Sequence, residues 1–277
     1  MPVRIITDST VDAVPAVMKR LTVVPLTVHF GTEEYIDGVT IDRQTFYKKL
    51  TEHEVMPTTS QAAPAAFQDV FEEVAAAGDS AVVLTISSKL SGTYQSAVIA
   101  ASDFENIYIV DGDTAAIGTG ILAQLALQMA DDGMDAAAIA QALEAEKKCI
   151  RIIAVVDTLQ YLQRGGRISK TAALAGGLLN IKPVLSIEAG QIRILSKARG
   201  TKQATEQMLR QIQACNADLE KPVLLGYTGL DPLPVQQFSQ DSKPLWADTL
   251  PYTCIGSVIG THAGPGAFAA AFFTKEG

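Results

Sequence analysis

The chain is predicted to adopt an α/β fold in two domains, because short strands alternate with amphipathic helices along its length. Near-continuous apolar runs at 80–86, 107–110 and 152–156 are typical of strands buried on both faces, as in parallel sheets. Alternation of strand and helix favours layered domains with right-handed crossovers. A length of 277 residues fits two such domains.

The N-terminal elements follow from the spacing of apolar residues. A first strand is expected at 3–7, where the sequence is Val-Arg-Ile-Ile-Thr. Apolar side chains recur three and four residues apart at 67–75 and at 121–129, which predicts one amphipathic helix at each place. An alanine-rich stretch at 136–148 predicts a third helix. We therefore expect a mostly parallel sheet flanked by helices.

The C-terminal part begins, by our interpretation, at the glycine-rich break 164–167, which divides the chain into domains 1–163 and 164–277. A short turn at 188–190 between two apolar runs predicts a β-hairpin, so this second α/β domain should be mixed. The other expected elements are a helix through 174–179, hairpin strands at 183–187 and 191–195, a helix at 201–215, a strand at 223–226, a loop at Pro232 and Pro234, a glycine-rich loop at 260–266 and a last strand ending at 273.

Composition excludes several classes of function. The formal net charge of −8 argues against nucleic acid as a partner and against stable binding to an anionic membrane. The cysteines Cys149, Cys215 and Cys254 are far apart and lack metal-ligand spacing, so we expect reduced thiols and no metal site. The sequence has no uncharged apolar run of about 18 residues and no signal-like apolar start. A cytoplasmic location is the resulting expectation.

Two hydroxyl-rich segments could hold an anion. Thr58, Thr59 and Ser60 precede a helix expected to open near Pro64, although helix capping is the simpler interpretation there. The segment 87–96 follows a buried strand and opens a helix, so free N–H groups and the helix dipole converge at a strand's carboxyl end. Nucleotide-binding glycine motifs are absent, and a single carboxylate or phosphate therefore suits the segment better.

His262 lies in the glycine-rich segment Gly260–Gly266, whose glycines permit unusual dihedrals and close backbone approach. A functional histidine and a structural one are about equally good interpretations of this position. A hydrolase that combines Ser91, His262 and an aspartate such as Asp8 or Asp111 is conceivable. The G-x-S-x-G motif expected around its nucleophile is absent, which weakens that alternative.

Positive charge is concentrated at 147–210, which holds twelve Lys and Arg residues and three acidic residues. The formal charge of this stretch is +9, whereas the rest of the chain carries −17. A solvated face is the simplest explanation, but the asymmetry is large. It predicts docking of an acidic partner or a transient contact with a membrane surface.

Seven motifs, read in order, resemble those of the DegV family of bacterial fatty-acid-binding proteins and span essentially the whole chain. They are Thr7-Asp8-Ser9-Thr10, Tyr35-Ile36-Asp37-Gly38, Thr59-Ser60-Gln61, Leu90-Ser91-Gly92-Thr93-Tyr94-Gln95, Gly165-Gly166-Arg167-Ile168-Ser169, Lys182-Pro183 and Gly260-Thr261-His262-Ala263-Gly264-Pro265-Gly266. The resemblance implies two α/β domains with one long-chain fatty acid between or beneath them. It implies no cofactor other than that ligand.

The resemblance also implies residue roles. In such proteins the carboxylate is held by the threonine and the serine that match Thr59 and Ser91, and the histidine matching His262 lies near the head group. The expected carboxylate site is Thr59, Ser60, Ser91, Gly92, Thr93 and His262. One departure is visible, because the family often has Pro-Ser-Pro where this chain has Ala62-Ala63-Pro64. The serine expected to cap the following helix is therefore missing.

A separate protein is expected to perform the chemistry. Members of the family present the fatty acid to a fatty acid kinase, which forms an acyl phosphate for phospholipid synthesis. Arg167 and Arg199 match basic residues implicated in docking that kinase. This chain is thus expected to be a lipid carrier and not an enzyme.

Simple energetics agree with this interpretation. A buried carboxylate needs several hydrogen-bond donors, and two hydroxyls with helix N–H groups supply them. Each buried methylene of the tail contributes about 0.8 kcal/mol. Two alternatives stay open at this point: a hydrolase or acyltransferase with Ser91 as nucleophile, and a protein that binds a small anion such as a sugar phosphate.

Overall fold

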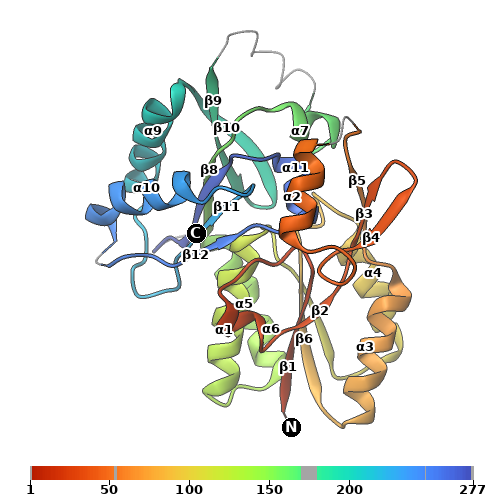
Figure 1. Ribbon diagram of the computed structural model, residues 1–277. Coiled ribbons are helices and arrows are strands. Elements are labelled where there is room, and N and C mark those ends of the chain that lie inside the picture. The colour runs from red at the N-terminus through yellow and green to blue at the C-terminus, as the bar shows by residue number, and fades with distance from the viewer. Residues whose placement is uncertain (1, 53–54, 170–179, 247, 276–277) are drawn as a thin grey trace.

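The computed structural model describes residues 2–52, 55–169, 180–246 and 248–275. Two large sheets and one small sheet organise these residues. In Figure 1 the N-terminal sheet occupies the lower part of the molecule and the other large sheet the upper part, with the small sheet beside them. The predicted helix through 174–179 lies outside the described residues.

The N-terminal sheet has four parallel strands in the order β2-β1-β6-β7. Its strands are β1 (Val3–Asp8), β2 (Thr22–Val24), β6 (Ser80–Thr85) and β7 (Ile107–Asp111). All six residues of β6 are buried, as its apolar sequence predicted, because helices cover both faces of the sheet.

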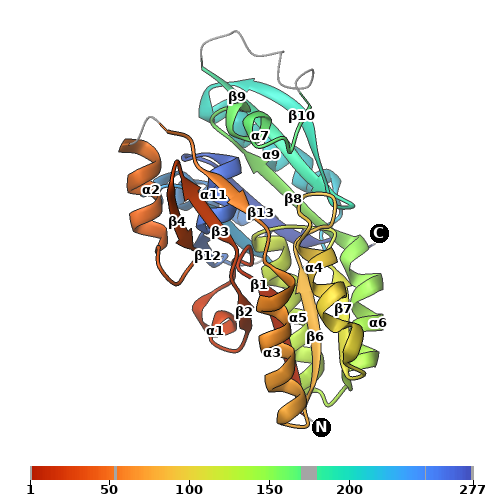
Figure 2. The same ribbon diagram turned by 90° about the vertical axis from the view of Figure 1, so that its right-hand side faces the viewer.

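Helices pack on opposite faces of this parallel sheet, as Figure 2 shows for α3 and α6. One side carries α3 (Pro64–Ala76) and α4 (Thr93–Ala100). The other side carries α5 (Ile117–Asp131) and α6 (Ala136–Glu146). The short helices α1 (Pro15–Met18) and α2 (Arg43–Glu52) lie on the connections.

The second large sheet has six strands in the order β10-β9-β8-β13-β11-β12 and is antiparallel except between β11 and β12. Its strands are β8 (Ile150–Val155), β9 (Ile181–Glu188), β10 (Gln191–Arg199), β11 (Leu224–Tyr227), β12 (Tyr252–Cys254) and β13 (Phe268–Phe273). Helices α9 (Gly200–Ala214) and α10 (Leu233–Asp241) cover one face through Met208, Ile212 and Phe238. The predicted α/β class, parallel N-terminal sheet and C-terminal hairpin are confirmed.

The two large sheets share a hydrophobic core through α5. Ile117 and Ile121 on this helix pack in one buried cluster with Ile5 of β1 and with Ile152 of β8. Strand β8, which falls within residues 1–163, pairs in the six-stranded sheet. The change from one large sheet to the other therefore falls between β7 and β8, and a domain division at 163/164 stays a prediction.

A third sheet was not anticipated from the sequence. It consists of β4 (Glu33–Ile36), β3 (Thr27–Phe30) and β5 (Thr58–Ser60), all antiparallel. Each strand has only three or four residues, too few for a clear alternation of polar and apolar side chains.

Two predicted loops were wrong, because both segments contain helix. Pro234 lies in the first turn of α10, where a proline's missing N–H costs nothing. The segment 260–266 includes the end of α11 (Ser257–Ala263), and Gly264 stops that helix with a φ of 73°. Gly260 allows close packing, since a β-carbon there would lie 2.6 Å from the Tyr47 hydroxyl.

The capping defect at α3 gives a first testable prediction. Ala63 is the exposed N-cap, has extended backbone dihedrals and makes no side-chain capping bond, and Pro64 follows it. Ala63→Ser should therefore raise the free energy of unfolding by about 1 kcal/mol, measured by denaturant unfolding of ligand-free protein. The control Ala65→Ser, at an exposed position inside the helix, should lower it slightly. Equal effects of the two substitutions would contradict the capping assignment.

Candidate functional site

A cavity of about 420 Å³ lies where the three sheets meet. Strand residues of the six-stranded and small sheets line it, together with residues that follow strands of the N-terminal sheet, such as Thr10 and Ile86. Its wall is mostly apolar, with Ile86, Leu90, Ile152, Leu185, Ile187 and Ile192 among the lining residues. Across β8 and β9, Ile152 pairs with Ile187 and the small Ala154 pairs with Leu185. An enclosed apolar space of this size suits a hydrophobic ligand.

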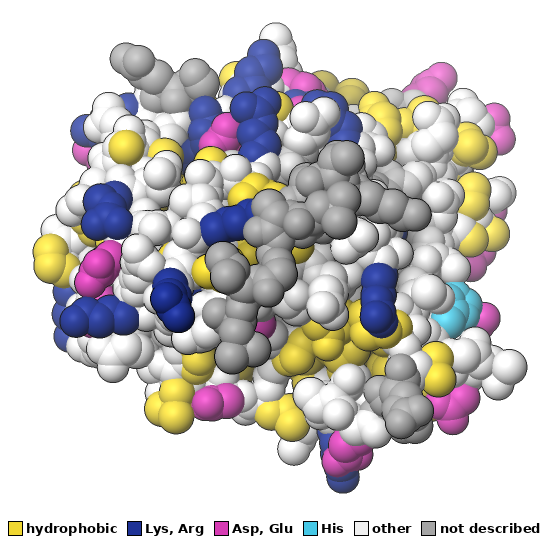
Figure 3. Space-filling view, turned by 90° about the horizontal axis from the view of Figure 1, so that it is seen from above, with side chains coloured by type: hydrophobic (Ala, Val, Ile, Leu, Met, Phe, Trp, Pro, Cys, Tyr) yellow, Lys and Arg dark blue, Asp and Glu magenta, His cyan; other side chains and the backbone are white. Residues whose placement is uncertain are grey.

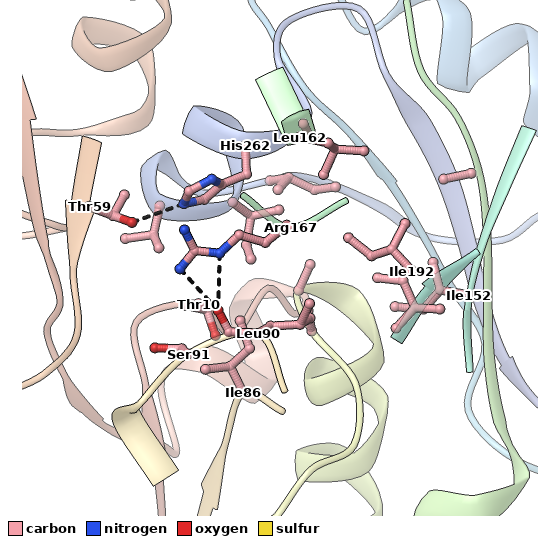
Figure 4. Close-up of a pocket in the computed structure, with 18 of the residues that line it drawn as sticks. Thr10, Thr59, Ile86, Leu90, Ser91, Ile152, Leu162, Arg167, Ile192 and His262 are labelled. Atoms are coloured by element: carbon pink, nitrogen blue, oxygen red, sulfur yellow. Dashed lines mark hydrogen bonds between the residues drawn. The ribbon is translucent and has the colours of Figure 1, made fainter. Parts of the chain in front are cut away.

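Polar groups gather at one end of the cavity, as Figure 4 shows. Thr59 comes from the middle of β5, Ser91 from the turn before α4, and His262 from the last turn of α11. Three motifs that are distant in the sequence thus supply residues to one cavity. Their assignment to a carboxylate stays a prediction.

Thr59 and His262 are in direct contact: 2.9 Å separates Thr59 Oγ1 from His262 Nε2. Burial, with the charge of Arg167 as a smaller cause, lowers the pKa of His262 to about 4. The imidazole is therefore neutral at pH 7, so one ring nitrogen donates and the other accepts. Nδ1 is buried without a hydrogen-bond partner in the described part of the chain.

The Ser91 turn is built by local hydrogen bonds. Ser91 Oγ lies 2.9 Å from Thr93 Oγ1 and accepts from the Thr93 backbone N–H at 3.3 Å. Gly92 is the N-cap of α4. A β-carbon on Gly92 would lie 2.0 Å from Gln61 Oε1, so only glycine permits this close approach of the two motifs. Gln61 also donates to Ser96 Oγ at 2.9 Å, which ties β5 to α4.

Ser60 lines the cavity, yet its hydroxyl has a partner elsewhere. Ser60 Oγ lies 2.9 Å from Nε2 of His29, which is on β3, the central strand of the small sheet. Of the two adjacent hydroxyls on β5, Thr59 is thus the one that contacts the histidine of the site.

Arg167 reaches into the same end of the cavity. Its Nε and Nη2 donate to the Leu90 carbonyl at 3.1 and 3.0 Å, and its Nη1 donates to the Gly165 carbonyl at 2.6 Å. Figure 4 shows its guanidinium between His262 and the turn that carries Leu90 and Ser91. Burial lowers the pKa of this guanidinium, which nevertheless stays charged at pH 7.

Sequence reasoning assigned Arg167 only to partner docking and missed its place at the cavity. The Gly165-Gly166 pair allows that place, because a β-carbon on Gly165 would lie 2.1 Å from His262 Nδ1 and Gly166 has a φ of 74°. Arg199, by contrast, is exposed at the end of β10 and does not line the cavity.

Helix α11, which carries His262, is held at its start by a buried carboxylate. Asp12 Oδ1 accepts from the Gly256 N–H at 2.9 Å and from Arg43 Nη2 at 2.8 Å. Burial raises the pKa of Asp12 to about 7, although the Arg43 charge opposes the rise. Tyr47 fixes the same region by donating to the Ile255 carbonyl at 2.9 Å.

Neither a metal centre nor a hydrolytic triad emerges from these contacts. Within the described ranges, no group of three or more His, Cys, Asp or Glu residues is arranged to hold a metal ion. The Ser91 hydroxyl engages Thr93, whereas His262 engages Thr59. None of the described helices is both long and apolar enough to cross a membrane.

The family model for "Uncharacterised protein, DegV family COG1307" matches residues 2–275, so the chain belongs to the DegV family, as its motifs predicted. A DegV domain-containing protein of Caldanaerobacter subterraneus subsp. tengcongensis is 37% identical, and the match covers 99% of each chain. A second such protein, from Clostridium perfringens, is 34% identical, and the match covers 98% of each chain.

Solved structures show the same fold with lipids named as ligands. A DegV family protein from Thermus thermophilus, described by its fatty acid binding, is 31% identical with a TM-score of 0.88, over 99% of this chain and 100% of that one. A DegV lipid-binding protein from Thermotoga maritima is 28% identical with a TM-score of 0.89, over 100% and 99%. The linoleic-acid-loaded fatty acid kinase B3 protein from Streptococcus pneumoniae is 20% identical over 99% and 100%, with a TM-score of 0.87, a likeness of fold alone.

The low pKa of His262 predicts a pH dependence of stability. As the pH falls through the ordinary histidine pKa near 6.5, the unfolded chain takes up a proton that the folded site accepts only near pH 4. His262 should therefore contribute less to the free energy of unfolding as the pH falls from 6.5 to 4, whereas Asp12, with its pKa raised to about 7, acts in the opposite direction. The free energy of unfolding of the wild type minus that of His262→Gln should fall over this range. Denaturant unfolding at a series of pH values measures the effect. An identical slope in the variant would contradict a buried neutral imidazole.

Proposed function

We propose that this protein binds one long-chain fatty acid, with the carboxylate at the Thr59–Ser91 end of the cavity and the tail along its apolar wall. The observation that carries the proposal is a mostly apolar cavity at one end of which Thr59, Ser91 and His262 gather. The relatives described as fatty-acid-binding or lipid-binding proteins support it. The mostly apolar lining offers few hydrogen-bond partners for the hydroxyls of a sugar phosphate, which disfavours that alternative.

The proposed head-group site balances one negative charge with mostly neutral donors. Thr59 and Ser91 offer hydroxyls, and Gly92 and Thr93 lie at the start of α4, where backbone N–H groups lack partners within the helix. The Thr93 N–H donates to Ser91 Oγ and so helps to place that hydroxyl. Arg167 supplies a positive charge nearby, although three of its bonds are already made to carbonyls. Such a site favours an anion without trapping it, which suits a carrier.

The tail supplies most of the binding free energy in this proposal. Burial contributes about 0.8 kcal/mol per methylene, or roughly 11 kcal/mol for about 14 methylenes before ordering costs. The purified protein should therefore retain fatty acid. Native mass spectrometry should show a mass excess equal to one long-chain fatty acid, lost on denaturation. Protein that arrives empty and gains no mass with oleate would contradict the proposal.

The two hydroxyls can be tested against adjacent controls. Thr59→Val and Ser91→Ala should each weaken oleate binding roughly ten- to a hundredfold, because each removes a hydrogen bond to a charged acceptor. The controls Thr58→Val and Ser88→Ala remove exposed neighbouring hydroxyls that do not line the cavity. Isothermal titration with delipidated protein measures all four. Equal losses in variants and controls would exclude the assignment.

We further propose that the loaded protein acts in the cytoplasm and presents its fatty acid to a separate fatty acid kinase, which forms an acyl phosphate. The motif resemblance and the basic segment 147–210 support this partner. Arg199 is exposed, so it is available for docking, whereas Arg167 faces the cavity and would act nearer the head group.

The docking role of Arg199 predicts a partner-specific loss. Arg199→Ala should weaken kinase association while oleate affinity stays unchanged, and association should fall as salt screens the charges. Lys243→Ala removes an exposed charge of the same sign outside the basic segment and is the matched control, which should leave association unchanged. Surface plasmon resonance at low and high salt measures both. Loss of lipid without loss of the partner would contradict the docking role.

A further inference from the structure

The turn at 87–91, which carries Ser91, is tied to the tip of the β9–β10 hairpin. Ser87 Oγ donates to the Gly190 carbonyl at 3.2 Å, and Lys89 Nζ donates to the Ala189 carbonyl at 2.6 Å. We call Ser87, Lys89, Ala189 and Gly190 the clasp. It joins the parallel sheet to the six-stranded sheet at the side of the cavity.

The backbone conformation of the hairpin tip is tightly restricted where it contacts the turn 87–91. Ala189 and Gly190 have φ angles of 45° and 73°, a pair typical of a tight hairpin turn. A β-carbon at Gly190 would lie 2.2 Å from Ser87 Oγ, so a side chain at this position has to displace that hydroxyl.

Charges around the clasp hold Lys89 in place. Asp113 lies 3.8 Å from the Lys89 ammonium group and 3.6 Å from that of the buried Lys147. Lys147 in turn pairs with Glu144 at 2.7 Å. The clasp is therefore part of an ordered polar network.

The clasp borders a part of the cavity wall that also faces the outside of the molecule. Leu90, Arg167 and Ile192 line the cavity and also line an open groove of about 680 Å³ on the outside. One layer of side chains thus separates the interior from the surface. The groove combines apolar residues such as Ile168 and Ile194 with the cations Lys89, Arg193 and Lys197. Figure 3 shows Lys and Arg side chains on this end of the molecule, with hydrophobic ones between them.

The turn 87–91 faces the tip of the β9–β10 hairpin and Arg167, and we call this boundary the seam. Contacts across the seam are easily broken. In the part of the chain that the structure describes, the hydrogen bonds between this turn and either the hairpin tip or Arg167 all use a side chain as donor: Ser87, Lys89 and Arg167. On its other side the turn is fixed by backbone donors, with Ser87 N–H to the Thr114 carbonyl at 2.9 Å and Ser88 N–H to Asp111 Oδ1 at 3.0 Å. The side-chain bonds across the seam can be exchanged for water individually, whereas each large sheet is held by continuous backbone ladders.

We propose that this seam is the portal through which an acyl chain enters and leaves the cavity, and that the clasp keeps it shut. The inference rests on the proposed fatty-acid function. Opening the seam would part the turn that carries Leu90 from the hairpin that carries Ile192 and so join the groove to the cavity. In the groove an apolar tail finds apolar contacts and its carboxylate finds lysine and arginine. A chain can then move sideways into the cavity, without passing its tail through the polar end at Thr59 and His262.

Two opposite variants test the portal. Lys89→Met removes one clasp bond and should speed both uptake and release of cis-parinaric acid roughly tenfold, with equilibrium affinity little changed. Arg210→Met removes an exposed cation that lies outside the groove and does not touch the clasp, and it should leave the rates unchanged. Stopped-flow fluorescence measures the rates.

The second variant locks the seam. In Ser87→Cys/Gly190→Cys the β-carbons would lie about 3.1 Å apart, a few tenths of an ångström below the range for disulfides. The oxidised form should exchange the probe at least tenfold more slowly than the same protein after reduction, which is its own control. Equal exchange in the oxidised and reduced forms, with probe bound by both, would overturn the portal. Absence of probe binding in every form, wild type included, would instead contradict the proposed function, and the portal with it.

Discussion

The hydrogen bond between Thr59 and His262 connects the small sheet to α11, and the polar end of the cavity depends on it. Thr59 is placed by pairing with Val28 in the sheet, whereas His262 is placed by a helix that Asp12 and Tyr47 anchor at its start. The two residues lie 203 positions apart in the chain. They meet only because the small sheet folds over the junction of the two large ones.

Some basic side chains of this protein form ion pairs within the fold, and others are exposed to solvent. Several cations of the basic segment are engaged within the fold: Lys147 with Glu144 and Asp113, and Lys182 with Asp157 at 2.6 Å. The formal charge of +9 in segment 147–210 is therefore larger than the positive charge that a docking partner would meet at the surface. What remains near the cavity is a smaller set along the groove, with Arg167 at the boundary between inside and outside. This arrangement places positive potential where an anionic ligand would enter and where a partner would approach.

Sequence patterns predicted the regular elements well, because long buried strands and amphipathic helices carry strong signals. The strand at 80–86 and the helices at 67–75, 121–129 and 136–148 all have counterparts in β6, α3, α5 and α6. The small sheet carried no such signal, since its strands are very short, and its sequence gives no hint that β5 would deliver Thr59 to the site. Prolines and glycines were misread as loop markers where they start a helix or allow close packing.

The sequence motifs indicated residues of the candidate site, but they did not indicate how these residues are arranged in space. Motif resemblance brought Thr59, Ser91 and His262 together, and the structure places all three on one cavity. The inward direction of Arg167 could not be read from the sequence, because it depends on how Gly165 packs against His262. The apolar wall was also unpredictable, since it is assembled across β8, β9 and β10 by strand pairing that no local pattern encodes.

The most direct test of the central claim is a crystal structure of the protein loaded with oleate. We expect carboxylate oxygens about 2.7–3.2 Å from Thr59 Oγ1 and Ser91 Oγ, and a tail that runs past Leu90 toward Ile152 and Ile187. A ligand bound with its methyl end at Thr59, or one bound outside this cavity, would contradict the account.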